Sequence, residues 1–291
     1  MSQQVNEYDV YKTDLRYRNN RKLSVDDYNR LDKKYHHLID VDMDNVEYRL
    51  RECMEGGGKV LDLSHLNLRT FPIKTPLTVE ELYMHGNNFE SQLDFSQLKS
   101  LKILDISNNQ LSVVPLLPLT VEELVCKSNS IHTLPDHLPF LRKLDCENNK
   151  ITIIPLYLEL EILIGSENII SKIPIMPKLK KLIIRKNKLI RILAMPYLHH
   201  IDCTFNKIIE IEPTSMIEEI YCDNNRIRSI SGFSNLRSLS CYNNPLKAIY
   251  FMPKLTELIC DYRSIKIDRE FKIKRAKRGD KIIQIIFHTQ S

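Results

Sequence analysis

The sequence predicts an α/β solenoid, a horseshoe with a parallel β-sheet on its concave face, a mostly extended convex side and a helical cap at the N-terminal end. Apolar residues recur at places one, four, six and eleven of a unit, as in Leu101, Leu104, Ile106 and Leu111. The unit recurs about every 20 residues, a period typical of solenoids. Prolines between the units oppose a regular helix on the return path, which indicates extended segments there.

Place nine of the unit holds an asparagine in nine consecutive units. The spacing between successive members is slightly longer in the first units and then becomes constant. An amide both donates and accepts hydrogen bonds, so we expect it to satisfy backbone groups where the chain turns off each strand. We therefore interpret as structural, rather than ligand-binding, the residues Asn87, Asn109, Asn129, Asn149, Asn168, Asn187, Asn206, Asn225 and Asn244.

Place six belongs to the inward side of a short strand, because places four and six alternate with outward places three, five and seven. Six of the seven cysteines occupy it: Cys126, Cys146, Cys203, Cys222, Cys241 and Cys260. Neighbouring strands lie about 4.8 Å apart, whereas a disulfide needs Cβ atoms about 3.8 Å apart. We expect reduced thiols that pack as small apolar groups, which indicates an intracellular protein.

These features resemble the leucine-rich repeat family over residues 58–265, in about 11 units. The short unit, with Leu-Pro or Ile-Pro after the asparagine as at Pro135 and Pro174, is similar to the subclass found in secreted bacterial effectors. Cysteine at place six and the richness in Ile, Lys, Asn and Tyr resemble repeat proteins encoded by giant DNA viruses. The resemblance implies a non-catalytic module that binds a protein partner. Because similar effectors carry a ubiquitin ligase after the repeats, and fewer than thirty residues follow here, the alternative is a substrate-recognition adaptor for a separate ligase or other host enzyme.

We divide the chain into four parts. Residues 1–23 are polar and predict a flexible arm, and residues 24–57 predict a helical cap. The repeats occupy residues 58–265. Residues 266–291 predict a C-terminal cap with a basic turn, whose alternating isoleucines indicate strands over the last exposed edge.

The N-terminal cap is expected because a horseshoe leaves the apolar edge of its first unit open. Ser24 and Asp27 resemble a capping box at the start of a first helix. A second helix is predicted from about Asn45 to the glycines that begin at Gly56. Its apolar side is expected to comprise Val46, Leu50, Cys53 and Met54.

The formal net charge of +5 comes from one segment. Residues 266–281 hold eight Lys and Arg against three Asp and Glu, the same excess as the whole chain. This distribution argues against a nucleic-acid surface along the solenoid. No apolar run is long enough to predict membrane insertion, and the first residues lack the pattern of a secretory signal. We expect a cytoplasmic protein, or one in the host cytosol if it is an effector; residues 274–277 resemble a nuclear-import signal, which makes the nucleus an alternative.

The concave face is the predicted surface for a protein partner of unknown identity. Outward isoleucines near the middle of the array, with cations beside them and aromatic residues further along, are typical of protein interfaces. The predicted partner-binding residues are Ile162, Ile164, Lys181, Ile183, Arg185, Phe205, Tyr221 and Tyr242. The alternative is that the isoleucines are ordinary surface residues.

No residue pattern predicts catalysis, a cofactor or a metal. His200 and Asp202 face outward near Glu219, but an open sheet lacks the dry pocket that acid–base catalysis requires. His199, His200 and Cys203 resemble a metal triad in composition. Cys203 is expected to face inward and His200 outward, so they cannot share an ion.

Overall fold

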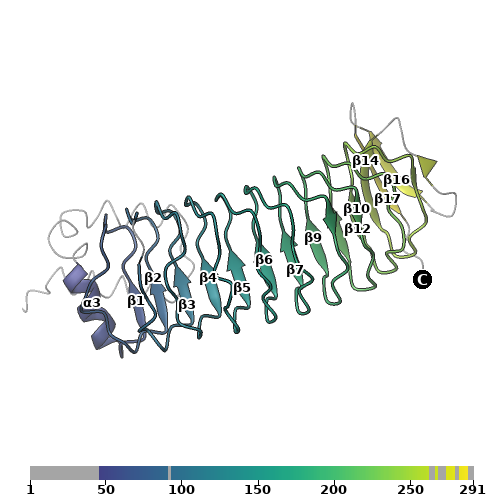
Figure 1. Ribbon diagram of the computed structural model, residues 1–291. Coiled ribbons are helices and arrows are strands. Elements are labelled where there is room, and N and C mark those ends of the chain that lie inside the picture. Colours follow the sequence, from purple (N-terminus) through teal and green to yellow (C-terminus); the bar gives the residue numbers. More distant parts are fainter. Residues whose placement is uncertain (1–45, 91–92, 262–265, 268–272, 279–281, 288–291) are drawn as a thin grey trace, which may run out of the picture.

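The computed structural model describes residues 46–90, 93–261, 266–267, 273–278 and 282–287. The predicted arm (1–23) and the first part of the predicted cap (24–45) lie outside the described residues. The described chain forms a stack of flat coils with one strand per coil on a common face (Figure 1). The predicted parallel solenoid is therefore confirmed.

Eleven short parallel strands, one for each repeat, make up most of a single sheet. All pair in register, so equivalent places of successive repeats lie side by side. The strands are β1 (Val60–Asp62), β2 (Glu81–Tyr83), β3 (Ile103–Asp105), β4 (Glu123–Val125), β5 (Lys143–Asp145), β6 (Ile162–Ile164), β7 (Lys181–Ile183), β9 (His200–Asp202), β11 (Glu219–Tyr221), β12 (Ser238–Ser240) and β14 (Glu257–Asp261).

The asparagine column joins each coil to the one before it. In a typical member, Asn149 Nδ2 donates to the carbonyls of Cys126 in the preceding repeat and of Cys146 in its own, at 3.0 and 3.2 Å. Its Oδ1 accepts a hydrogen bond from the backbone N–H of Ile131 at 2.9 Å. The same pattern recurs at Asn168, where the partners shift forward by one repeat. Each amide therefore links turn backbone of two adjacent repeats inside the coil.

The seven cysteines are free and buried. Burial raises the pKa of Cys260 to about 12, and it raises the pKa values of the Cys126 and Cys222 thiols well above their ordinary value. The thiols are therefore protonated and unreactive at neutral pH. They act as small packing groups, and Cys222 Sγ also donates to the Ser240 carbonyl at 3.2 Å.

Gly165 interrupts the place-six column between Cys146 and Cys203. A Cβ atom at Gly165 would lie 2.9 Å from Ile184 Cδ1 and 3.5 Å from Cys146 Sγ. The larger isoleucine of the next repeat therefore fills the space that the glycine leaves.

Gly165→Ala is expected to lower the free energy of unfolding by about 1–3 kcal/mol, because the added methyl overpacks a closed core. Ile184→Val removes the Cδ1 atom that the methyl would meet. The double variant should therefore be more stable than the two single losses together predict, which a urea denaturation cycle measures. Purely additive losses would contradict this complementary packing.

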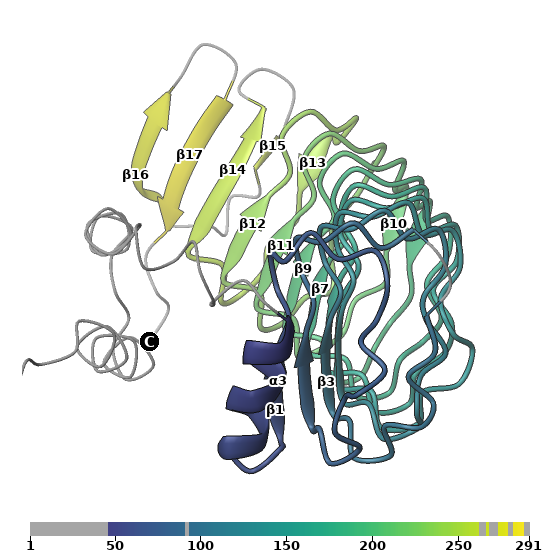
Figure 2. The same ribbon diagram turned by 90° about the vertical axis from the view of Figure 1, so that its left-hand side faces the viewer.

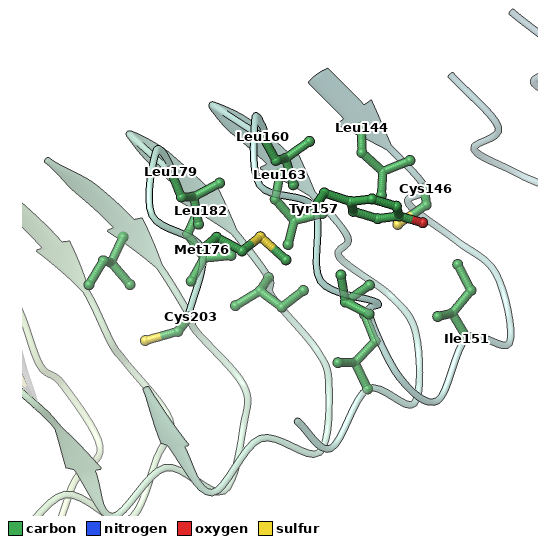
Figure 3. Packing of buried hydrophobic residues seen from close by; sticks show 14 of the residues in the cluster. Leu144, Cys146, Ile151, Tyr157, Leu160, Leu163, Met176, Leu179, Leu182 and Cys203 are labelled. Carbon is green, nitrogen blue, oxygen red and sulfur yellow. The ribbon is translucent and has the colours of Figure 1, made fainter. Parts of the chain in front are cut away.

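The convex side is extended, with no helix among the described residues of the repeats. Short parallel pairs form there between β8 (Arg191–Ile192) and β10 (Glu210–Ile211), and between β13 (Ala248–Ile249) and β15 (Lys266–Ile267). Tyr157 and Met176 reach from this side toward the sheet and close the core (Figure 3). The buried Tyr157 hydroxyl donates to the Pro135 carbonyl at 2.6 Å. The extended convex side predicted from the prolines is confirmed.

The helix α3 (Val46–Glu55) packs beside β1 at the N-terminal end (Figure 2). Its inward side includes Cys53, which belongs to the buried core, and Val46 and Leu50, which pack against that core, whereas Met54 is exposed. The expectation that Met54 faces inward was wrong, because Met54 lies at the edge of the helix side that Val46, Leu50 and Cys53 present to the core. The helix stops where the Gly58 N–H donates to the Cys53 carbonyl at 2.8 Å. No helix of the described residues is long and apolar enough to cross a membrane.

A hairpin ends the sheet at the other end. β17 (Ile282–Phe287) pairs antiparallel with β14, and β16 (Ile273–Arg278) pairs antiparallel with β17. Ile285, opposite Leu258 in this pairing, is buried. The hairpin therefore lies on the edge that β14 would otherwise leave open (Figure 2).

Residues just before the strands carry charges that alternate in sign along the stack. Glu80 lies between Lys59 and Lys102, with nitrogen–oxygen distances of 2.8 and 2.7 Å. Hydrogen bonds from Lys102 and Lys59 lower the pKa of Glu80 to about 2. The same alternation places Lys180 2.5 Å from Glu161. Because the charges largely cancel, this row adds little net field to the adjacent sheet.

Candidate protein-interaction surface

The concave face presents the residues at places three, five and seven. Each strand has a buried residue at place four, and most have more accessible neighbours, as in β6 and β11, whereas β9 and β12 also bury their place-five residues, Asp202 and Ser240. The alternation expected from the sequence is therefore present in the sheet. The alternation determines which side chains lie on the concave face, but it does not determine how exposed each of them is.

The predicted partner-binding residues fall into two groups along this face. Ile162 and Ile164 on β6 pair in register with Lys181 and Ile183 on β7. Tyr221 lies on β11 and Tyr242 follows β12, so β9 separates these aromatics from the isoleucines. Phe205 follows β9 and lies between the groups in strand order. Lys181, Arg185 and Phe205 are exposed, whereas the three isoleucines and two tyrosines are half-buried.

Arg185 is held by a carboxylate on the neighbouring repeat. Its Nε donates to Asp202 Oδ2 at 2.6 Å, and its Nη2 contacts the same oxygen. Asp202 lies in register with Ile183 on the outward side of the sheet, as expected, but it is only 3% exposed. Its Oδ1 accepts from the Thr204 hydroxyl at 3.0 Å, so the two oxygens are occupied from different sides. The guanidinium is thereby fixed over the concave face rather than free to move.

Asp223 positions the aromatic end of the surface. Its Oδ1 accepts from the Tyr242 backbone N–H at 2.7 Å, and both oxygens accept from the Ser240 hydroxyl at 2.7 and 2.8 Å. Burial raises the pKa of Asp223, and these hydrogen bonds act in the opposite direction. The carboxylate therefore serves the turn that carries Tyr242.

Phe205 adopts a backbone conformation that is unfavourable for its residue type. Its φ is 57°, in the left-handed region. The equivalent place is left-handed in the other repeats as well: it holds Asn108, Asn148, Asn224 and Asn243, and also Ser128, Glu167 and Lys186, with φ of 50–57°. Asparagine tolerates this region, whereas a bulky aromatic rarely adopts it. The Phe205 side chain is nevertheless 55% exposed, so core packing does not explain its presence.

Two polar constellations on the concave face resemble reactive sites in composition. The hydroxyl of Ser64 and the Asp105 carboxylate lie 2.9 and 3.5 Å from the same nitrogen, Nδ1 of His85. A proton relay needs its two partners on opposite ring nitrogens. His200 Nδ1 lies 2.9 Å from Glu219 Oε2 as a simple side-chain pair. Within the described part of the chain, no three His, Cys, Asp or Glu side chains could hold a metal ion.

The core periodicity of the repeat does not predict the exposed apolar side chains outside the concave face. Five of them lie in the turns just before β2, β4, β5, β6 and β9: Leu77, Leu119, Phe140, Leu158 and Tyr197. They occur three or four residues before a strand, a place to which the core periodicity assigns no role. A search for apolar residues at non-core places of the repeat would have found them.

Comparisons with known proteins agree with this architecture. A sequence model described as Leucine Rich Repeat matches residues 100–121. Protein PAC2 of Saccharomyces cerevisiae (strain ATCC 204508 / S288c) is 33% identical over 115 residues, which is 35% of this chain and 22% of that protein. The chain thus spans about a fifth of the length of this relative.

Two solved structures of YopM share the fold. YopM from Yersinia pestis, described as a leucine-rich effector protein, is 26% identical with a TM-score of 0.64 over 73% of this chain and 63% of that one. YopM from Yersinia enterocolitica WA-314 is 22% identical with a TM-score of 0.62, over 84% and 65% of the two chains. The chain spans less than two thirds of both structures. The parallel stack of short repeats and these likenesses together show that the chain has the leucine-rich repeat fold, built from short repeats as in the two YopM structures.

Proposed function

We propose that the chain is a non-catalytic protein-interaction module that binds a protein partner on its concave face, around β6, β7, β9 and β11. The leucine-rich repeat fold is a common protein–protein interaction module, which supports this role. The partner-binding residues are those named from the sequence, with Phe205 as the central contact. Seven free, buried thiols support a location inside a cell.

The strained, exposed Phe205 is the observation that carries this proposal. Holding a bulky residue in the left-handed region costs about 1–3 kcal/mol, and such residues cluster at functional sites. Aromatic residues are also enriched among those that dominate binding energy. An exposed aromatic that weakens the fold is explained if a partner covers it.

The surroundings of Phe205 fit an interface. Ile183 lies on β7 and Tyr221 on β11, the two strands that flank β9 in the sheet. Arg185 is already ordered by Asp202, so binding costs less side-chain entropy than for a free arginine. Apolar contacts flanked by an ordered arginine are typical of the centre of a protein interface.

Phe205→Asn is expected to separate stability from binding. The free energy of unfolding should rise by about 1 kcal/mol, because asparagine tolerates the left-handed conformation. Partner recovery should fall at least severalfold when the tagged chain is purified from its native cell and analysed by quantitative mass spectrometry. Leu158→Asn is the matched control, since it removes an equally exposed apolar side chain outside the concave face.

Unchanged partner recovery with Phe205→Asn would contradict the concave site. If Leu158→Asn lowers partner recovery instead, the partner binds the turns that precede the strands and not the concave face. The adaptor role for a ubiquitin ligase stays a prediction. It requires that ubiquitination of the captured partner also depend on Phe205.

A further inference from the structure

One row across the concave sheet combines apolar residues with a single charge. Val125, Asp145, Ile164 and Ile183 occupy place five of β4, β5, β6 and β7, and the strands pair so that each residue lies opposite the next. We call this the Asp145 row. Its members are half-buried and follow one another at the strand spacing of about 4.8 Å.

The Asp145 carboxylate lacks the cation that its equivalents have. Asp105 lies 3.5 Å from His85, and Asp202 is bonded to Arg185. Among the residues that the structure describes, no Lys, Arg or His nitrogen lies within 4.0 Å of Asp145. Its one hydrogen bond comes from the Glu147 backbone N–H, at 3.2 Å.

The charged residues around Asp145 leave its carboxylate available to pair with a cation of a partner. Burial raises the pKa of Asp145, whereas the hydrogen bond from the Glu147 N–H and the charges of Lys127 and Lys143 act in the opposite direction. Lys143 is engaged with Glu123 at 3.1 Å. A half-buried carboxylate without a contacting cation, set in an apolar row, is complementary to a Lys or Arg that carries apolar neighbours.

The spacing of the row selects the conformation of the segment that covers it. Side chains on one face of a helix recur about every 5.4 Å along its axis, close to the strand spacing of about 4.8 Å. In an extended segment, side chains on one face recur about every 6.6 Å. Over the three intervals between four strands, the side chains of a helix drift from the residues of the row by about 2 Å in total, whereas those of an extended segment drift by about 5 Å.

We infer that the partner presents an amphipathic helix that lies across β4 to β7, with a Lys or Arg over Asp145 and apolar side chains over Ile164 and Ile183. This inference rests on the proposed concave-face function and names the chemistry of the partner segment. It predicts a basic residue followed by apolar residues three or four and seven or eight positions away in the helix.

A display library of random peptides, each long enough for about four helical turns, tests the inference on the full chain. Selected peptides should carry this basic and apolar spacing and gain helical circular dichroism on binding. Their affinity should fall about tenfold or more with Asp145→Asn, because an unpaired cation remains. Asn keeps the acceptor for the Glu147 N–H. Asp62→Asn is the control, since Asp62 has the same place and accepts the Ser64 N–H at 2.9 Å.

The outcomes separate the inference from the function on which it rests. Peptides that depend on Ile183 and Phe205, yet bind Asp145→Asn equally well or bind as extended chains, would overturn the helical, basic partner and leave the concave site intact. Peptides whose affinity is unchanged by substitution of Asp145, Ile183 and Phe205, or a library that yields no binders, would overturn both the helical partner and the concave binding site.

Discussion

Asn149→Ala is expected to lower the free energy of unfolding by about 3 kcal/mol, the largest effect predicted for one polar side chain of this protein. The substitution removes hydrogen bonds to Ile131, Cys126, Cys146 and Glu147. The three carbonyls keep another donor, because Asn129 also bonds to Cys126, Asn168 to Cys146, and the Ser128 N–H to Glu147. The buried N–H of Ile131 alone is left without an acceptor, and this orphaned donor dominates the loss.

The loss should also uncouple the two halves of the array. Each repeat contacts only its neighbours, so a weakened interface lets the units on either side unfold separately. Urea denaturation should show a lower midpoint and a shallower or biphasic transition. Asn148→Gly is the control, because Asn148 is exposed at φ 53° and glycine tolerates that conformation. Equal losses for the two variants would contradict a structural role for the buried amide.

Arg185→Glu is expected to lower the free energy of unfolding by about 2–3 kcal/mol, because it places a second carboxylate beside the buried Asp202. The estimate lies below that for a fully buried pair, since the Arg185 side chain is 56% exposed. Lys186→Glu is the matched control. Lys186 lies 2.5 Å from Glu167, and both side chains are well exposed, so its reversal should change stability little.

The Arg185 result decides how binding is measured on this surface. A charge reversal that unfolds part of β9 would abolish partner binding without showing that Arg185 contacts the partner. The pair Arg185→Gln and Asp202→Asn removes both charges and should recover most of the lost stability. Chemical denaturation of the three variants checks this, and equal stability of Arg185→Glu and Lys186→Glu would contradict it.

The repeat period was sufficient to predict the backbone of this fold. Inward Leu at place four and Cys or Ile at place six could be assigned because a strand alternates with period two and each unit repeats its neighbour. The asparagine column followed from the need to satisfy turn backbone inside the coil. The hairpin strands followed from the alternating isoleucines, but their antiparallel pairing with β14 could not, since it depends on how the chain returns after the last repeat.

The candidate surface was only partly predictable. Periodicity assigned Asp202 to the outward side, yet its burial depends on Arg185 and Thr204 reaching over it from neighbouring places. The strain at Phe205 could not be recognised before the left-handed conformation of place eight was known. The exposure of Met54 could not be recognised from the sequence, because a residue at the edge of an apolar helix side is buried or exposed according to what packs beside it.

The antiparallel strand β17 has a consequence for how this array could change its length. From β1 to β14, all neighbouring strands of the main sheet are parallel and belong to similar repeats. An additional repeat inserted between two of them would therefore find matching partners on both sides, unlike at the antiparallel pair of β14 and β17. A further parallel repeat cannot be added after β14, because the free edge of β14 is already paired with the antiparallel strand β17. Duplications should therefore accumulate within the array, and the terminal hairpin should be carried along unchanged.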